Sequence, residues 1–329
     1  MKKFKSVKDV FKKKDELIEG PEVVIVVVGE TGSGKSTLIN TITGSSAVKI
    51  GSGLGSLTKK VEAVKWQHDG RIFVLVDTPG FDDTELSEEE VFSRIAQFLQ
   101  LLYEQRILVN GIIYLHPISN IRMRGSSIQM LRLFKQLCGS NGLRNAILVT
   151  TMWNRVESKE GLSRQKRLEE DYWKPMIEHG SHTYAYRGSQ AEAHEIINQI
   201  LLNQSTVLQI QRELVDQKRK LLQTEAGQVV DADLASSINR MQERLKQLHN
   251  LIDETHQDAP DKLAESEINE DVKEYLSGIK TMEANRARLD DDYAKALHAL
   301  REKIRALSQV QQISNTDALW AVFGAQQES

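Results

Sequence analysis

The stretch Gly29-Glu30-Thr31-Gly32-Ser33-Gly34-Lys35-Ser36 decides the fold of this chain. It matches the phosphate-binding pattern G-x-x-x-x-G-K-[ST] at every fixed position. The six residues before it, 23–28, are five valines and one isoleucine, which is typical of a parallel strand buried on both faces. Residues 37–40 read as the first turn of a helix. A strand, a glycine-rich turn and a helix in this order predict a loop that wraps a phosphate chain.

The residue types of this loop suit phosphate chemistry. Its glycines let backbone N–H groups point at a phosphate chain, and the helix N-terminus adds partial positive charge. We expect Lys35 to reach the β- and γ-phosphates of a nucleotide and the Ser36 hydroxyl to ligate Mg²⁺. The alternative is a glycine-rich turn that binds nothing. The expected nucleotide-binding residues are Gly29, Glu30, Thr31, Gly32, Ser33, Gly34, Lys35, Ser36 and Thr37.

The bulk composition limits the classes of protein to which the chain can belong. Its 329 residues suffice for about two domains, and the net charge of −3 shows no excess of positive charge that would indicate a nucleic-acid partner. Cys138 is the one cysteine, so no internal disulfide can form, which suits a reducing compartment. The sequence shows no apolar run of membrane-spanning length and no apolar core of a secretion signal. We therefore expect a soluble, cytoplasmic protein.

The first twenty residues form a basic leader. They contain seven lysines and four acidic residues, a net charge of +3. Phe4, Val7 and Phe11 recur at helical spacing, so one interpretation is a short amphipathic helix that contacts a membrane surface. The other interpretation is a solvated leader. We therefore consider two locations for the protein, the cytoplasm and the periphery of a membrane.

A second phosphate-related motif follows a predicted β-hairpin. Residues 61–66 and 71–76 read as two strands joined by the turn signal Asp69-Gly70. The second strand ends in Asp77-Thr78-Pro79-Gly80, a D-x-x-G pattern. We expect Asp77 to hold Mg²⁺ through water and the Gly80 N–H to sense the γ-phosphate. Downstream of a phosphate loop and at the end of an apolar strand, this short pattern is a specific one.

A further Mg²⁺ ligand is expected in the loop after the first helix. Residues 44–56 are rich in glycine and serine, and a nucleotide switch keeps its metal-binding threonine in such a loop. Thr58 is the first candidate and Ser56 the second, and the alternative is an ordinary loop threonine. The catalytic candidates are then Lys35, Thr58 and Gly80, and the metal candidates are Ser36, Thr58 and Asp77.

Taken together, these motifs resemble a known group of proteins. Residues 29–37 (GETGSGKST) and 77–84 (DTPGFDDT) resemble the septin and AIG1/Toc-type GTPases. Residues 114–122 (YLHPISNIR), 149–156 (VTTMWNRV) and 208–216 (LQIQRELVD) are similar to the G-domain proteins common in fungal genomes. The resemblance covers roughly residues 22–230. It implies a guanine-nucleotide-binding α/β domain of the translation-factor-related class, with GTP or GDP and Mg²⁺ as cofactors.

The resemblance also indicates where the base is read. Such domains carry [NT]-K-x-D at the end of the strand expected at residues 146–150, and here the sequence is Thr151-Met152-Trp153-Asn154. Met replaces Lys and Asn replaces Asp, which puts guanine specificity in question but not nucleotide binding. Thr151 and Asn154 remain the base-contacting candidates, and the loop at Gly188 would contact the base through its backbone. In a different arrangement, Trp153 would stack on the base.

Two features bear on the rate of hydrolysis. Phe81 follows D-x-x-G at the position where some relatives carry a water-positioning Gln, so we expect slow chemistry. Arg122 and Arg124 follow the strand expected at 111–115, and either could face phosphates, a partner or solvent. One hypothesis is that one of them completes the site of a second molecule. Helices are expected at 129–137 and 191–202, a charged helical stretch at 162–180, and a short strand at 183–186.

The composition changes near residue 204, where glycine becomes scarce. Apolar residues then step alternately by four and three in two runs, each a heptad seam, and Ala259-Pro260 separates the runs. We expect two long helices folded back on each other, the second ending near Gln312. Arg286 lies in the seam of the second helix, and we expect its side chain either to pair with an acidic residue of the first helix or to extend outward. The seams are Leu234, Ile238, Met241, Leu245, Leu248 and Ile252, and Val272, Tyr275, Ile279, Met282, Arg286, Leu289, Tyr293, Ala296 and Leu300.

The sequence thus predicts an α/β fold, a three-layer domain of the P-loop NTPase class with a mostly parallel sheet, followed by a long α-helical coiled-coil hairpin. The expected segments are the leader at 1–20, the G domain at 21–203, the hairpin at 204–312 and a tail at 313–329 with apolar residues that either dock or are disordered. The expected function is a slow GTPase switch that signals through the hairpin. The alternative is a nucleotide-binding scaffold or membrane-associated assembly module with negligible hydrolysis. Expected partners are a guanine nucleotide, a second copy of the chain and a membrane surface.

Overall fold

A computed structural model describes residues 22–46, 60–81, 86–258 and 262–324, without the side chains of residues 253–266. Its centre is a six-stranded sheet in the order β2-β3-β1-β4-β5-β6, in which β2 runs antiparallel to β3 and the other neighbours are parallel. This is the predicted mostly parallel sheet. The strands are β1 (Val23–Gly29), β2 (Glu62–His68), β3 (Arg71–Asp77), β4 (Gly111–Pro117), β5 (Ala146–Thr151) and β6 (His182–Ala185).

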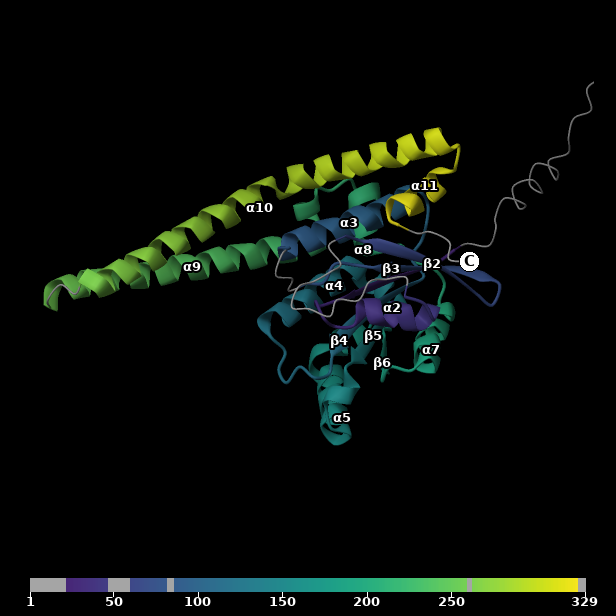
Figure 1. The fold of residues 1–329 in the computed structure, drawn as a ribbon, viewed down its shortest axis with the longest axis horizontal. Helices are drawn as coiled ribbons and strands as arrows, with labels where there is room; N and C mark the ends of the chain where they lie inside the picture. Colours follow the sequence, from purple (N-terminus) through teal and green to yellow (C-terminus); the bar gives the residue numbers. More distant parts are fainter. Residues whose placement is uncertain (1–21, 47–59, 82–85, 259–261, 325–329) are drawn as a thin grey trace, which may run out of the picture.

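Two helical layers cover the sheet (Figure 1). On one face lie α2 (Lys35–Thr43) and α7 (Gln190–Leu201), which pack on Ile25 and Val27 of β1. On the other face lie α3 (Glu88–Glu104) and α4 (Gly125–Gly142), which pack on Val24 and Val26. All seven residues of β1 are therefore buried, as the run of valines predicts.

Helix α3 was not predicted from the sequence, although its start carries a clear signal. The side chain of Ser87 accepts a hydrogen bond from the Glu90 backbone N–H, and the Glu90 carboxylate accepts one from the Ser87 N–H. This reciprocal arrangement is a capping box, whose S-x-x-E pattern is visible in the sequence. Glu88 and Glu89 add negative charge at the positive end of the helix dipole.

Helix α4 begins four residues before its predicted start and is broken inside. Gly139 has φ 65°, a left-handed conformation that glycine adopts without strain. A Cβ there would lie 2.5 Å from the Gln209 Cβ, so the break also admits a close neighbour. The remaining short elements are η1 (Leu143–Asn145), η2 (Trp153–Arg155), α5 (Ser158–Arg167), the π-helical η3 (Leu168–Tyr172), α6 (Lys174–Ile177), α8 (Gln209–Gln211), the π-helical η4 (Arg212–Asp216) and η5 (Leu221–Gln223).

The two predicted long helices are α9 (Glu225–Asp258) and α10 (Lys262–Gln311), which pack against each other and project from the domain (Figure 1). At 1.5 Å per residue, 34 and 50 residues correspond to about 51 and about 75 Å. Arg286 pairs with Asp231 of the first helix, Nε to Oδ1 at 2.5 Å and Nη2 to Oδ2 at 2.8 Å, which confirms the first of its two expected arrangements. The buried seam residues include Leu234, Ile238, Leu248, Val272, Ile279, Leu289 and Tyr293.

The hairpin starts later than residue 204, the predicted start of the helical region. Leu208 and Ile210 are fully buried, and the Gln211 Nε2 donates to the Leu99 carbonyl of α3 at 2.9 Å. This segment therefore packs on the sheet domain instead of continuing the heptad. Helix α9 begins only at Glu225, whose N–H donates at 3.0 Å to the fully buried carboxylate of Glu213.

The apolar residues near the chain end form a docking patch. Leu319 and Trp320 of α11 (Asn315–Val322) are buried, and the Trp320 Nε1 donates to the Glu22 carboxylate at 2.5 Å. The Phe323 carbonyl accepts a hydrogen bond from the Ala63 N–H of β2 at 2.8 Å. Residues 315–323 thus pack at the β2 side of the sheet. Every helix among the described residues is too short or too polar to cross a lipid bilayer.

Candidate functional site

The predicted phosphate loop joins β1 to α2. Gly32 and Gly34 have φ 76° and 98°, so two of its glycines adopt the left-handed backbone that other residues avoid. The Lys35 side chain is buried and folds back over the loop, where its Nζ donates to the carbonyls of Gly29 and Glu30 at 3.0 Å each. The ammonium group is therefore held over the loop that the sequence predicts to wrap phosphates.

Two of the three predicted metal ligands lie together. The Ser36 Oγ donates to the Asp77 Oδ2 at 2.6 Å, although the two residues are 41 positions apart. The parallel register of β1 and β3 pairs Val27 with Asp77 and so places the carboxylate beside the phosphate loop. The third predicted ligand, Thr58, and its alternative Ser56 lie outside the described residues.

The D-x-x-G segment closes directly on the phosphate loop. The Thr31 N–H donates to the Phe81 carbonyl at 2.7 Å, and the Phe81 N–H donates to the Gly29 carbonyl at 3.3 Å. A Cβ on Gly80 would lie 2.6 Å from the Thr31 N and Cα. Only a glycine permits this approach without displacing one of the two segments.

Two side chains of the loop have unmet hydrogen-bonding capacity. The hydroxyls of Thr31 and Ser33 are buried, and within the described part of the chain neither has a hydrogen-bond partner. Burying a hydroxyl without a hydrogen-bond partner costs folding free energy, so such groups in a loop of this kind indicate a ligand-binding site. Together with Lys35 and the Ser36–Asp77 pair, they fit a phosphate-bearing ligand and a hard cation with oxygen ligands.

Glu30 connects the phosphate loop to the loop between β4 and α4 and to the first turn of α4. Its carboxylate accepts hydrogen bonds from the Ser127 Oγ and from the Asn120 Nδ2, the latter at 3.3 Å. The sequence motif identified Glu30 only as a residue of the phosphate loop. No sequence signal predicted its hydrogen bonds to residues about 90 positions away. Arg122 and Arg124 are exposed on this same β4–α4 loop.

The end of β5 lies beside the phosphate loop, as the resemblance implies. The Thr151 Oγ1 donates to the Ser33 carbonyl at 2.8 Å. Met152 has φ 61°, and its Cε would lie 3.8 Å from a Cβ on Gly34. The thioether therefore occupies the side of the loop where the motif of relatives carries a lysine. Asn154 is exposed in η2, one turn further on.

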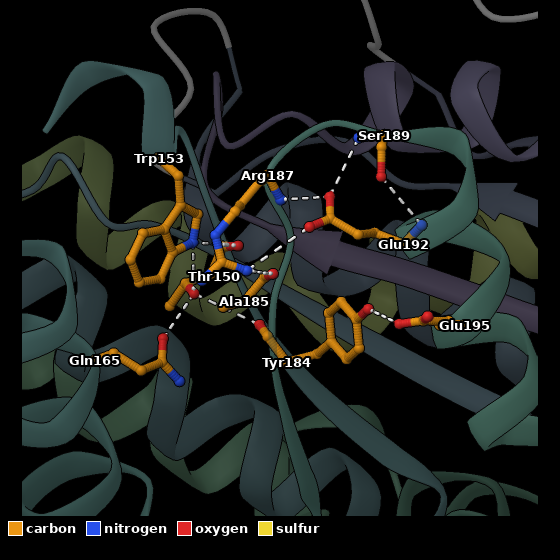
Figure 2. A network of polar contacts seen from close by, with 9 residues as sticks. All are labelled: Thr150, Trp153, Gln165, Tyr184, Ala185, Arg187, Ser189, Glu192 and Glu195. Atoms are coloured by element: carbon orange, nitrogen blue, oxygen red, sulfur yellow. Dashed lines mark hydrogen bonds and ion pairs between the residues drawn. The ribbon is translucent and has the colours of Figure 1, made fainter. Parts of the chain in front are cut away.

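The loop after β6 is joined to the end of β5 by a polar network (Figure 2). The Arg187 guanidinium lies over the Trp153 ring, 5.0 Å from its centroid. The Glu192 carboxylate accepts from the N–H groups of Arg187 at 3.0 Å and Ser189 at 3.2 Å, and this fixes the turn at Gly188, whose φ is 109°. Burial acts to raise the pKa of Glu192, but these hydrogen bonds and the Arg187 charge outweigh it and lower the pKa.

Trp153 is largely buried. Its Nε1 donates to the carbonyl and the hydroxyl of Thr150 at 3.2 and 3.0 Å, and a Cβ on Gly161 would lie only 2.7 Å from the ring. Arg187 covers the ring as well (Figure 2). The side chain therefore fills the space between β5 and α5, and in this structure its ring packs against protein groups.

Comparison with known proteins agrees with this geometry. Residues 23–178 match the model of the AIG1 family. Cell division control protein 11 of Saccharomyces cerevisiae is 26% identical over 32% of this chain, and the match spans 28% of that protein.

Among solved structures, Toc33 from Arabidopsis thaliana in complex with Mg²⁺ and GMPPNP is similar at a TM-score of 0.47 and 14% identity, covering 60% of this chain and 92% of that one. Era from Aquifex aeolicus bound to GDP and AlF4⁻ is similar at 0.42 and 18%, covering 57% of each. In its motifs, its sheet and the family match over residues 23–178, the domain built on β1–β6 is similar to the G domains of the septin/AIG1/Toc-like group of P-loop GTPases.

Proposed function

We propose that this chain binds GTP and GDP with Mg²⁺ and acts as a slow GTPase switch whose state is read by the α9–α10 hairpin. The observation that carries the proposal is the Ser36 Oγ to Asp77 Oδ2 contact at 2.6 Å, directly after the phosphate loop. A hydroxyl and a carboxylate from two separate motifs meet where Mg²⁺ is held in P-loop domains.

Each residue has a defined task in the proposal. The Thr31 and Ser33 hydroxyls and the Lys35 ammonium hold the phosphates, and Ser36 and Asp77 hold the metal, with Thr58 as a third ligand. The Thr151 end of β5, Asn154 and the Gly188 turn lie on the side of the base. When bound, Mg²⁺ neutralises the charge that develops on the phosphate oxygens.

Slow hydrolysis is part of the proposal because of Phe81. Its side chain is apolar and 5% exposed, and it packs in the core between the sheet and α3. A side chain in this environment cannot orient an attacking water, which is the task of Gln in faster relatives. Arg122 or Arg124 of a second molecule is the proposed source of the missing charge, which would make hydrolysis depend on self-association.

The relay to the hairpin runs through the same residue. Phe81 lines a cavity of about 720 Å³ whose other walls are the start of α3, one side of α4 and facing stretches of α9 and α10, including Val230, Leu234 and Met282. The Phe81 backbone is hydrogen-bonded to the phosphate loop at Thr31. A γ-phosphate that competes for the Thr31 N–H would therefore shift Phe81 within this cavity.

Helix α3 gives the relay a second, rigid connection. Arg301 of α10 binds the Glu104 carboxylate through two nitrogens, with the Nε to Oε2 distance at 3.0 Å. The Tyr293 hydroxyl donates to the Gln100 Oε1 at 2.6 Å, and burial raises the pKa of this tyrosine. Movement of α3, which follows the D-x-x-G segment in the chain, would be transmitted to α10.

A scaffold with negligible hydrolysis is the second candidate. The observation that favours it is again the buried Phe81, together with the length of a hairpin that extends beyond the G domain (Figure 1). Single-turnover hydrolysis separates the two functions: a rate that rises with protein concentration supports the switch, and no turnover at any concentration supports the scaffold.

Lys35→Ala tests nucleotide binding itself. The lysine supplies charge-assisted hydrogen bonds to phosphates, each worth about 1.5–3 kcal/mol, so we expect the affinity for labelled GTP to fall by at least about tenfold. Lys174→Ala removes an exposed lysine of α6 and is the matched control, which should bind as the wild type does. An unchanged dissociation constant for Lys35→Ala would refute the phosphate-loop assignment.

A further inference from the structure

A second cavity lies outside the phosphate loop, between the loop that follows β4 and helix α5. Its volume is about 480 Å³, within the range of ligand pockets. Asn120 belongs to its wall and also donates to Glu30 of the phosphate loop. The cavity thus adjoins the nucleotide site without sharing the residues expected to bind the nucleotide. The polar residues that matter for its chemistry are His116, Asn120, Arg122, Arg164, Arg167 and Tyr172.

The wall of this cavity is strongly basic. Three arginines line it, from two separate elements, and Glu160 is the one carboxylate among the described residues of the wall. That carboxylate is already paired with the Arg164 Nη2. The cavity therefore keeps positive charge that no acidic residue of its own wall balances.

The three arginines differ in how firmly they are held. The Arg164 Nη1 donates to the carbonyls of Ile118 and Ser119 at 2.8 and 3.1 Å, so this guanidinium is fixed against the β4–α4 loop. Arg167 makes only a long contact of 3.4 Å with the exposed carboxylate of Asp171, and Arg122 is exposed. One fixed and two exposed guanidinium groups can bind an anion with planar, two-pronged hydrogen bonds.

His116 adds an unpaired polar atom. It is 2% exposed, and its Nδ1 has no hydrogen-bond partner among the described residues. Burial lowers the pKa of this histidine to about 4, so the ring is neutral near pH 7. Because the Nδ1 has almost no accessible surface, the neutral ring forms part of the cavity wall and adds no charge to it.

From this arrangement, we propose that the cavity binds a small phosphate monoester, with Arg122, Arg164 and Arg167 around the phosphate. The phosphate group supplies the several acceptor oxygens that three guanidinium groups can use. The volume leaves room for a small organic group but not for a long chain. This site is separate from the guanine nucleotide site of the same molecule, and Arg122 is the residue that it shares with the function proposed above.

Calorimetric titration with glycerol 3-phosphate tests the proposal. The full chain is saturated with GDP and Mg²⁺, and the titration is repeated in the Lys35→Ala background, which removes competition at the phosphate loop. Arg122→Ala/Arg167→Ala removes the two exposed arginines of the cavity. The control is Lys159→Ala/Lys166→Ala, which removes the same charge from exposed positions of α5 that do not line the cavity.

We expect the wild type and the lysine control to bind the ester equally, and the arginine variant to bind it at least about tenfold more weakly. The absence of binding to the wild type, or equal affinity of the two double variants, would overturn the proposal. Flotation with phosphatidate-containing vesicles distinguishes the sources of the group. Arginine-dependent flotation assigns the site to a lipid headgroup, and its absence alongside binding of glycerol 3-phosphate assigns it to a free metabolite.

Discussion

At Gly80, the lack of a side chain determines how closely two loops approach. A Cβ at this position would lie 2.3 Å from the Thr31 Oγ1 and 2.6 Å from the Thr31 backbone. We therefore expect Gly80→Ala to push the D-x-x-G segment off the phosphate loop and to destabilise the fold by about 1–3 kcal/mol, as overpacking does. Urea unfolding measures this change. Gly125→Ala is the control, because a Cβ there meets open space at the start of α4, and an equal loss of stability in both variants would contradict the close approach.

Asn154 carries the question of base preference. Guanine offers two donors at the edge that an aspartate usually meets, whereas an asparagine has one acceptor oxygen and one donor amide. An unpaired buried donor costs about 1–3 kcal/mol, so we expect Asn154→Asp to tighten GTP binding by roughly 5- to 150-fold and to sharpen discrimination against ATP and XTP. Competition titrations with the three nucleotides measure this. If the ranking and the GTP affinity stay the same, Asn154 does not contact the base.

For individual residues, the sequence predicted those roles that follow from a short local motif. The spacing of Ser36 and Asp77 within their motifs implied that the two would meet, and they do. The role of Trp153 could not be read in the same way, because its position in the loop leaves open whether the ring faces a ligand or the interior. Arg187 and Gly161, which enclose it, come from different elements, and no pattern joins them to it.

Among the described side chains of the hairpin, Arg286 and Asp231 form an ion pair between the two helices, and the strength of this pair should depend on pH. The hydrogen bonds from Arg286 lower the pKa of Asp231, against the opposing effect of partial burial and with help from the Arg286 charge. A lowered folded-state pKa means that the stabilisation is present above the unfolded pKa of about 4 and is lost as the pH falls through the folded value. The two side chains are 40% and 34% exposed, so solvent screens the pair.

We therefore expect Asp231→Asn to cost less than about 1 kcal/mol at pH 7. The difference from the wild type should shrink as the pH falls through the lowered pKa of Asp231. Thermal unfolding of both proteins across acidic pH measures it. Asp291→Asn, at an exposed position of α10, should show no such pH-dependent difference, and a constant difference for Asp231→Asn at all pH values would exclude the ion pair as its cause.

Whole elements were predictable where their pattern repeats. The heptad seams indicated both long helices, and Gly278 lies so close to the partner helix that a Cβ would be 2.7 Å from the Met241 Cε. Helix α3 was not predicted, although Val91, Ile95, Phe98 and Leu102 step by four, three and four and a capping box stands at Ser87 and Glu90. For residues 319–323, the sequence was compatible with docking and with disorder. The reason is that Glu22 and Ala63, which bind this segment, are far away in the sequence.

For the molecule as a whole, the sequence predicted the parts but not their arrangement. Arg301 and Glu104 are 197 positions apart, and Tyr293 and Gln100 are 193 apart. These contacts place α10 along α3, and a single sequence holds no periodic signal for them. The same is true of the cavity between Phe81 and the hairpin, which exists only once the G domain and both long helices are in place.

The central claim is that nucleotide state reaches the hairpin through Phe81. Hydrogen–deuterium exchange tests it most directly, in segments 229–237 of α9 and 274–285 of α10, which contribute walls of the cavity beside Phe81. The wild type is compared with GDP and with a non-hydrolysable GTP analogue, alongside Phe81→Ala and Leu202→Ala, the latter a control at an exposed leucine. We predict that exchange in these segments differs between the two nucleotides in the wild type and in Leu202→Ala, and that the difference disappears in Phe81→Ala. Identical exchange with both nucleotides in the wild type would contradict the claim.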